Sequence, residues 1–293
     1  MSGIQSANQS ATHSSLYLVG TPIGNLEDIS LRALRILKEV DLIACEDTRQ
    51  TAKLLNHYGV ETRTISYHQH NELTRSAELI MHLEQGHSIA LVTDAGMPGV
   101  SDPGFRLVSL AIRHKIPVVP IPGASAFLSA LVASGLPTDS FAFHGFLPSK
   151  LGQRRKLLEE IQHSARTQIF YEAPHRLLGT LEDIVDVLGP HRRVVVAREV
   201  TKMYEEFLRV TAAEAYEEFK KRVEVRGEIT LLVARAEEQH GLPAVKQKNA
   251  RTRVRELMKA EEIDEKEAMK RVAKEMGISK SDVYRELQKD GKK

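Results

Sequence analysis

Residues 91–104 read Leu91-Val92-Thr93-Asp94-Ala95-Gly96-Met97-Pro98-Gly99-Val100-Ser101-Asp102-Pro103-Gly104, and the predicted architecture follows from them. An apolar strand, Ser88 to Val92, leads into a loop with three glycines and two prolines, and a helix begins near Phe105. Glycines let a backbone approach a ligand closely, and prolines stiffen the loop between them. Ligands of open α/β sheets bind at the carboxyl ends of strands. An ordinary strand-to-helix turn is the alternative, but this composition favours a ligand-binding loop.

Strand-like and helix-like segments alternate on both sides of this loop, which predicts an α/β fold with a mainly parallel sheet covered on two faces. We expect a first α/β domain over residues 16–135 and a second over residues 136–236, in which hairpins replace some of the crossovers. The strands predicted for the first domain are Leu16 to Val19, Leu42 to Cys45, Arg63 to Tyr67, Ser88 to Val92 and Pro117 to Ile121. Those predicted for the second are Phe141 to Phe146, Gln168 to Tyr171, Val194 to Ala197 and Ile229 to Val233.

The two ends of the chain differ from this pattern. Residues 1–15 are rich in Ser, Gln, Asn and Thr, which predicts a disordered leader and neither a signal peptide nor a membrane anchor. Residues 245–293 carry 15 Lys and Arg against 10 Asp and Glu, and they predict three short helices, Ala250 to Ala260, Glu265 to Met276 and Ser281 to Lys289. Gly277 in a turn between the last two fits a helix-turn-helix. A plain helical packing domain is the alternative.

The composition excludes several classes of protein. Of 293 residues, 42% are hydrophobic and 27% are charged, as in water-soluble globular proteins. The single cysteine, Cys45, excludes an intramolecular disulfide and a multi-cysteine metal site, and it is consistent with a cytoplasmic protein. We expect no membrane span, because no segment approaches 18 uncharged apolar residues. We expect no metal site, because the 12 histidines show no ligand spacing.

Seven short motifs in order along the chain resemble those of the tetrapyrrole-methylase-type S-adenosylmethionine methyltransferases. They are the loop over residues 20–25, Cys45-Glu46-Asp47-Thr48-Arg49, the loop over residues 94–104, Pro122-Gly123-Ala124-Ser125-Ala126, Gly145-Phe146-Leu147-Pro148, Glu172-Ala173-Pro174-His175-Arg176 and Arg198-Glu199-Val200-Thr201-Lys202. The resemblance covers residues 16–236. Within that group the chain resembles bacterial enzymes that methylate the ribose 2′-oxygen of a cytidine in small-subunit (16S) ribosomal RNA.

This resemblance implies two α/β domains, a cofactor (S-adenosylmethionine) in the cleft between them, and a homodimer. It implies cofactor-binding residues in both domains. They are Pro22, Asp94, Ala95, Gly96, Val100, Ser101, Ala124 and Ser125 in the first, and Phe146, Tyr171, Gly227, Glu228 and Ile229 in the second. Residues 94–99 match neither the usual dinucleotide fingerprint nor its place after a first strand, which disfavours a nucleotide-phosphate site.

Transfer of a methyl group to a hydroxyl oxygen needs a positioned base, and no metal. Charged residues at predicted strand ends are the candidates, namely Glu46, Asp47, Glu172, Glu199 and Lys202. We favour as catalytic group Glu46, Asp47 and Arg49, in which an acid takes or orients the hydroxyl proton and Arg49 grips a phosphate. Because Glu46 and Asp47 are adjacent, they point to opposite faces of an extended strand, and one of them faces the substrate. An ion pair that closes the gap between the domains is the alternative.

Basic residues in two regions are candidates for contacting RNA phosphates. They are Arg154, Arg155 and Lys156, together with Lys246, Lys248, Arg251, Arg253 and Arg255 in the tail. A solvated face is the alternative for both groups. His175 and Arg176 are further candidates for the RNA backbone, or His175 caps the helix that follows.

Three hypotheses of function follow. The first is an RNA 2′-O-methyltransferase that acts on 16S ribosomal RNA or the small ribosomal subunit in the cytoplasm. The second is a small-molecule methylase of the same fold acting on a tetrapyrrole, although polar strand ends and the added tail argue against it. The third is a nucleic-acid-binding regulatory protein that uses the helix-turn-helix of its tail.

Overall fold

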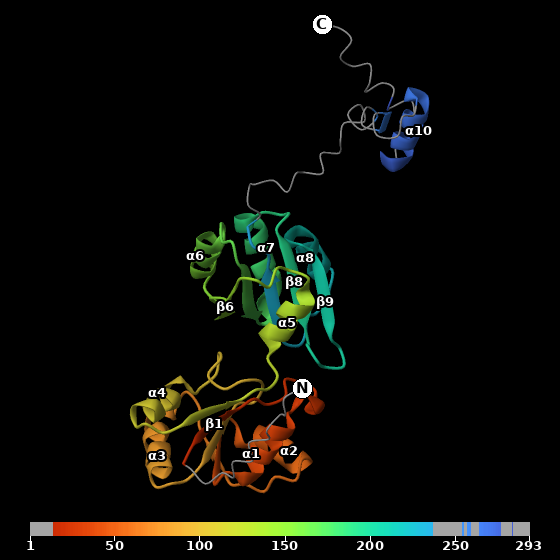
Figure 1. Cartoon of the computed structure of the whole chain (residues 1–293). Coiled ribbons are helices and arrows are strands. Elements are labelled where there is room, and N and C mark those ends of the chain that lie inside the picture. The colour runs from red at the N-terminus through yellow and green to blue at the C-terminus, as the bar shows by residue number, and fades with distance from the viewer. Residues whose placement is uncertain (1–13, 237–253, 255–256, 259–263, 277–282, 284–293) are drawn as a thin grey trace, which may run out of the picture. The chain divides into compact units, whose positions relative to one another are not determined.

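The computed structural model describes residues 14–236, 254, 257–258, 264–276 and 283. The chain divides into two compact units, residues 1–236 and residues 237–293, which are described separately (Figure 1). The predicted leader lies outside the described residues except for Ser14 and Ser15.

The first unit contains two five-stranded sheets, and the first sheet is parallel throughout, in the order β3-β2-β4-β1-β5. Its strands are β1 (Leu16–Val19), β2 (Leu42–Cys45), β3 (Thr64–Ser66), β4 (Ile89–Val92) and β5 (Val118–Ile121). Its helical segments are η1 (Leu26–Asp28), α1 (Leu31–Glu39), α2 (Thr48–His57), α3 (Glu72–Glu84) and α4 (Phe105–Arg113). The predicted parallel sheet is therefore confirmed, and the strand that precedes the glycine-rich loop is its central one.

Alternate residues along the strands of the first sheet pack into two hydrophobic cores, one on each face of the sheet. Ala90 and Val92 of β4 pack with α1 and α2, whereas Ile89 and Leu91 of the same strand pack with α3 and α4. A strand covered on both faces buries every side chain, which is why β4 reads as a continuous apolar run.

The second sheet is mixed, in the order β6-β7-β10-β8-β9. Only β6 and β7 are parallel in it, and β7-β10, β10-β8 and β8-β9 are antiparallel. Its strands are β6 (Phe141–Phe146), β7 (Thr167–Glu172), β8 (Arg193–Arg198), β9 (Glu206–Thr211) and β10 (Ile229–Val233). Its helical segments are α6 (Leu151–Ile161), η2 (Pro174–Arg176), α7 (Leu177–Leu188) and α8 (Ala212–Lys220). One hairpin, β8-β9, is present where hairpins were expected, and β9 is a strand that was not predicted from the sequence.

Helix α5 (Ala126–Ser134) covers one face of the second sheet, and α6, α7 and α8 cover the other (Figure 1). Val195 and Ala197 of β8 pack towards α5, whereas Val194 and Val196 pack towards α7 and α8. Helix α5 is apolar on most sides and follows directly from the end of β5, so it carries the chain from the first sheet onto the second. The division at residues 135 and 136 stays a prediction, because both sheets belong to one unit.

In the second unit, helix α10 (Glu265–Met276) has the bounds predicted from the sequence. Its buried Ala268, Met269 and Val272 pack with Val254, Leu257 and Val283. The first and third helices predicted for the tail, its turn and its basic residues from Lys246 to Arg255 lie almost wholly outside the described residues. Among the helices described here, none has the length and apolar character that crossing a bilayer requires.

Candidate functional site

Three strand ends of the first sheet meet at its carboxyl edge. The loop after β1 pairs with the loop after β4, since the Thr21 N–H donates to the Gly96 carbonyl at 2.9 Å and the Gly96 N–H donates to the Thr21 carbonyl at 3.1 Å. The loop after β5 is equally close, because a Cβ at Gly123 would lie 2.7 Å from the Gly20 Cα. These glycines are needed because no side chain fits between the two backbones.

The glycine-rich loop has the backbone geometry that its sequence predicted. Gly96, Gly99 and Gly104 have φ angles of +84°, +82° and +147°, a region that other residues rarely adopt. Ser101, in the same loop, has a φ of +62°, which costs free energy for a residue with a Cβ. Strain of this kind clusters at ligand sites.

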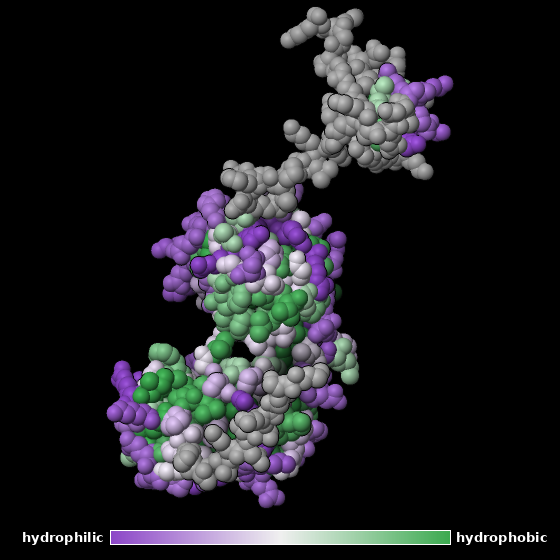
Figure 2. Space-filling model, in the orientation of Figure 1, coloured by the Kyte–Doolittle hydropathy of each residue, from purple (hydrophilic) through white to green (hydrophobic). Residues whose placement is uncertain are grey.

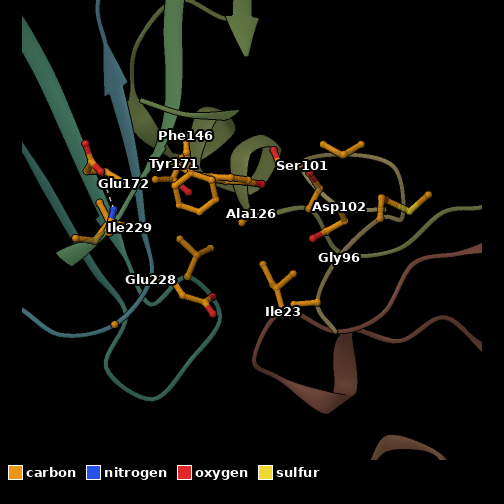
Figure 3. Close-up of a pocket in the computed structure, with 18 of the residues that line it drawn as sticks. Ile23, Gly96, Ser101, Asp102, Ala126, Phe146, Tyr171, Glu172, Glu228 and Ile229 are labelled. Carbon is orange, nitrogen blue, oxygen red and sulfur yellow. Dashed lines mark hydrogen bonds between the residues drawn. The ribbon is translucent and has the colours of Figure 1, made fainter. Parts of the chain in front are cut away.

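A cavity of about 380 Å³ opens beside this loop and is closed on its far side by the second sheet. In Figure 3, Gly96, Ser101, Asp102 and Ile23 lie across the cavity from Phe146, Tyr171, Glu228 and Ile229. The lining residues are Ile23, Ala95, Gly96, Met97, Val100, Ser101, Asp102, Ser125, Ala126, Phe146, Tyr171, Glu172, Ala173, Pro174, Val200, Gly227, Glu228, Ile229 and Thr230. Its size falls within the range of roughly 300–1,000 Å³ that is common for small-molecule sites.

Most residues predicted to bind the cofactor line this cavity. Those in the lining are Ala95, Gly96, Val100, Ser101, Ser125, Phe146, Tyr171, Gly227, Glu228 and Ile229. Pro22, Asp94 and Ala124 are not in the lining, although each is next in sequence to a residue that is. Residues more than 100 positions apart, which the sequence predicted to share one site, thus lie around one cavity. Their role in binding the cofactor stays a prediction.

Sequence reasoning missed several lining residues, of which Asp102 is the most informative. Its carboxyl is half-buried, and this burial, together with the charges of Glu46 and Asp94, raises its pKa to about 6. A second aspartate in a glycine-rich loop after a buried strand was the available signal. Ile23 and Val200 were also missed, because apolar residues in loops are indistinguishable from core residues in the sequence.

The three residues predicted to be catalytic lie outside the cavity lining, at the end of β2. Burial raises the pKa of Glu46, and the neighbouring Asp94 raises it further. The electrostatic coupling between Glu46 and Asp102 links this strand end to the cavity, which Asp102 lines. Glu46 is therefore a better proton acceptor than an ordinary surface carboxylate.

Asp47 and Arg49 instead belong to the start of helix α2. The Asp47 carboxylate caps the helix by accepting from the Arg49 backbone N–H at 2.8 Å. The Arg49 guanidinium also binds it, through Nε at 3.1 Å and Nη2 at 2.8 Å, and these bonds hold the pKa of Asp47 at about 2. Helix α2 consequently begins at Thr48, directly after its cap. The predicted ion pair exists, but it is local to the helix.

A buried carboxylate and an arginine shape the opposite wall. Glu172 is 2% exposed, and its oxygens accept from the Ala173 N–H at 2.8 Å and from the Thr180 hydroxyl at 2.6 Å. Arg176 Nε lies 3.3 Å from Glu172 Oε1, while Arg176 Nη2 donates to the carbonyls of Leu147 and Pro148 at 2.6 and 2.9 Å. The motifs at residues 145–148 and 172–176 are therefore one structural element. His175 is exposed, whereas the Arg176 guanidinium already binds Glu172 and two backbone carbonyls; contact of either residue with RNA stays a prediction.

Two of the arginines predicted to contact RNA have structural partners. Arg154 is 8% exposed and its Nε donates to Asp183 at 2.6 Å. Arg155 binds both Asp183 and Asp186 at 2.7 Å. The prediction is wrong for Arg154, because burial and the ion pair between α6 and α7 keep its charge away from solvent. Lys156 is exposed.

Histidine, cysteine and carboxylate side chains do not come together as a metal site anywhere among the described residues. The cavity instead combines backbone groups, an aromatic pair and carboxylates. The Phe146 and Tyr171 rings lie 5.6 Å apart, centroid to centroid, and are tilted by 60°. Such a lining suits an organic molecule with a flat ring and a positive charge.

Known proteins resemble this chain in sequence and in fold. The profile of the Tetrapyrrole (Corrin/Porphyrin) Methylases matches residues 15–216. The Ribosomal RNA small subunit methyltransferase I of Halalkalibacterium halodurans is 49% identical over 285 residues, covering 96% of each chain. The protein of the same name from a Synechocystis species is 46% identical over 279 residues, covering 94% of this chain and 99% of its own.

Among solved structures, the uroporphyrin-III-C-methyltransferase of Thermus thermophilus superposes with a TM-score of 0.54. It is 20% identical and covers 75% of this chain and 94% of its own, so it supports the fold alone. The α/β fold with two sheets is thereby confirmed. This chain belongs to the tetrapyrrole methylase family and, within it, to the group of the ribosomal RNA small subunit methyltransferases I.

Proposed function

We propose that this chain transfers a methyl group from S-adenosylmethionine to the ribose 2′-oxygen of a cytidine in small-subunit (16S) ribosomal RNA. The observation that carries the proposal is 49% identity over 96% of both chains with a Ribosomal RNA small subunit methyltransferase I. The alternatives drawn from the sequence, a tetrapyrrole methylase and a nucleic-acid-binding regulatory protein, are not favoured by that likeness. The choice of the cytidine 2′-oxygen rests on the motifs in the sequence.

The cavity fits the cofactor in size and chemistry. Gly96 offers backbone groups that no side chain covers, and the Phe146 and Tyr171 rings can hold a flat base between apolar surfaces. When bound, the cofactor supplies an electrophilic methyl group on a positively charged sulfur. The Asp102 carboxylate in the lining is ionised above its pKa of about 6 and favours such a cation. The residues proposed to hold the cofactor remain Pro22, Asp94, Ala95, Gly96, Val100, Ser101, Ala124, Ser125, Phe146, Tyr171, Gly227, Glu228 and Ile229.

Glu46 is the proposed proton acceptor for the ribose hydroxyl. Burial and the charge of Asp94 raise its pKa, whereas the bonds from Arg49 lower the pKa of Asp47 to about 2 and make it a poor base. Asp47 is proposed to orient the strand end, because its backbone N–H donates to Asp94 Oδ1 at 3.2 Å. Arg49, with its side chain 88% exposed, is proposed to grip a phosphate of the RNA.

We further propose that the chain acts as a cytoplasmic homodimer on ribosomal RNA or the small ribosomal subunit. The packed helices α3 and α4 support a dimer, because they expose Leu73, Met81, Phe105 and Ile112 at 63%, 56%, 79% and 63%. Apolar surface of this kind marks interfaces, and Figure 2 shows hydrophobic residues on this part of the first unit. Sedimentation analysis that finds only monomers at micromolar concentration would refute the dimer.

The test of the proposed function is a methyl-transfer assay with the purified full chain. Small ribosomal subunits that lack the mark and cofactor with a tritiated methyl group are mixed, and label is expected in the RNA, at one cytidine, on the ribose. Uroporphyrinogen serves as the competing substrate. Label in the tetrapyrrole, or unlabelled RNA from subunits that a known relative does label, overturns the proposal. Glu46→Gln is expected to lower kcat by about 10²–10⁴-fold, and Asp47→Asn by much less.

A further inference from the structure

The turn over residues 199–202 joins the end of β8 to the cavity and holds backbone in a strained conformation. Glu199 and Thr201 have φ angles of +53° and +70°, in the region that glycine favours. Such residues cost free energy and persist only where the surroundings hold them in place. Val200, between them, lines the cavity.

Glu199 holds the cavity wall at residues 227–228. Its backbone N–H donates to the Glu228 carbonyl at 2.9 Å, and its Oε1 accepts from the Glu228 N–H at 2.9 Å. Gly227 leaves room for this, because a Cβ there would lie 2.5 Å from the Glu199 Cγ. The Glu199 side chain thus lies flat against a wall that both Gly227 and Glu228 form.

Lys202 connects that wall to the first sheet. Its Nζ lies 2.9 Å from Glu199 Oε1 and 3.1 Å from Glu228 Oε2. Its aliphatic stem crosses Gly24, where a Cβ would lie 2.2 Å from the Lys202 Cγ. Gly24 follows Ile23, which lines the cavity from the β1 loop. Against the opposing effect of burial, the two carboxylates raise the pKa of Lys202, so the ammonium stays charged.

We propose that Lys202 is a positioning residue that sets the spacing between the β1 loop and the wall at residues 227–228, and thereby the affinity for the cofactor. Lys202 is no base in this scheme, because its ammonium is held between two carboxylates and stays charged. Without the Lys202 ammonium, the carboxylates of Glu199 and Glu228 would lie close together with no cation between them. Their repulsion would release the strained turn and displace Val200 together with the wall.

This inference rests on the proposed function, because it concerns the cofactor of that reaction. Titration calorimetry with S-adenosylmethionine and S-adenosylhomocysteine measures binding directly. Lys202→Met keeps the stem over Gly24 and removes the charge, and we expect it to weaken both ligands by about tenfold or more. Lys202→Arg is expected to stay within about threefold of the wild type. Lys221→Met, an exposed lysine of the same half of the unit, is the matched control and should bind as the wild type does.

A positioning role also predicts a split in the kinetics and a rescue. With cofactor raised to saturation, Lys202→Met should recover most of its kcat while its KM for the cofactor stays high. In the double variant Lys202→Met with Glu199→Gln, the repulsion is gone while an amide oxygen can still accept from the Glu228 N–H, and binding should be at least threefold tighter than in Lys202→Met alone.

Three results overturn the inference. One is unchanged binding by Lys202→Met, another is a low kcat at saturation, and the third is strictly additive effects of the two substitutions. Failure of the proposed function is distinguishable from all three, because it appears in the wild-type chain, which would then leave ribosomal RNA unlabelled in the methyl-transfer assay whether or not it binds the two ligands.

Discussion

Arg176 offers the sharpest test of how the cavity wall is held together. In Arg176→Met, the fully buried Glu172 carboxylate keeps only the Ala173 N–H and the Thr180 hydroxyl, and the carbonyls of Leu147 and Pro148 lose their donor. Removing one partner of a buried ion pair costs about 3–5 kcal/mol, because a charge is left buried without its counter-ion. We therefore expect the free energy of unfolding to fall by about 4 kcal/mol. That is a large share of the roughly 5–15 kcal/mol that stabilises a typical domain.

Urea unfolding followed by far-ultraviolet circular dichroism measures this loss, since the chain has no tryptophan to serve as a fluorescent probe. In the double variant Glu172→Gln with Arg176→Met the stranded charge is gone, and about 2 kcal/mol should return. Arg35→Met is the control, because the Arg35–Glu39 pair is shorter, at 2.7 Å against 3.3 Å, but lies on the surface, and its loss should cost at most about 0.5 kcal/mol. A loss below about 1 kcal/mol in Arg176→Met, or a double variant no more stable than the single one, would refute the reasoning.

Three other changes test single features. The pKa of Asp102 is raised to about 6, which means that its ionised form is unfavourable in the folded protein. Asp102→Asn should therefore stabilise the ligand-free chain by roughly 1–2 kcal/mol at pH 8 and by nothing below pH 4. Thermal unfolding at both pH values measures this difference. Hydrogen bonds from Arg222 hold the pKa of Glu206 at about 2, so the ionised Glu206 stabilises the fold fully above about pH 4.5 and loses this effect as the pH falls to 2. Glu206→Gln should therefore lower the melting temperature at pH 7. The melting temperatures of the wild type and the variant, followed against pH, should converge near pH 2. Gly123→Ala puts a Cβ 2.8 Å from a backbone oxygen of the β1 loop and should abolish cofactor binding in calorimetry, whereas Gly152→Ala, with open space around it, should bind normally.

The fold was largely predictable because the apolar segments and turn residues that determine most of its helices and strands are local features of the sequence. β1, β2, β6, β10 and α10 have the bounds predicted for them, and each is a short apolar run or an amphipathic segment between glycines, prolines or polar caps. Strand β9 was missed for a physical reason: it is an edge strand whose residues are mostly half-buried and include Glu206 and Arg209, and only its pairing with β8 makes it a strand. Likewise, the start of α2 depends on the Asp47 cap, a contact that propensity alone does not assign.

The cavity was predictable to the extent that backbone geometry defines it. Glycines at positions 96, 99 and 104 predict positive φ angles from the sequence alone, and the structure has them. The residues next to such glycines are the ones expected to line a cavity. Charged residues were harder, because the sequence shows a charge but not its partner. Arg154 and Asp183 are 29 residues apart, and nothing in either segment indicates that the two side chains are buried against each other.

This difference explains which of the charged motifs can take part in chemistry. Glu172 with Arg176 and Arg154 with Asp183 are closed pairs, in which each charge already has its counter-ion and its hydrogen bonds. Glu46 has no such counter-ion among the described contacts: burial and Asp94 disfavour its ionised form, and only His68 opposes them. A carboxylate left in this state gains most from a nearby positive charge or an incoming proton. The carboxyl edge of the first sheet therefore holds negative charge that the fold itself does not neutralise. A cationic methyl donor would be attracted to that charge, and the proton of the ribose hydroxyl would be accepted by it.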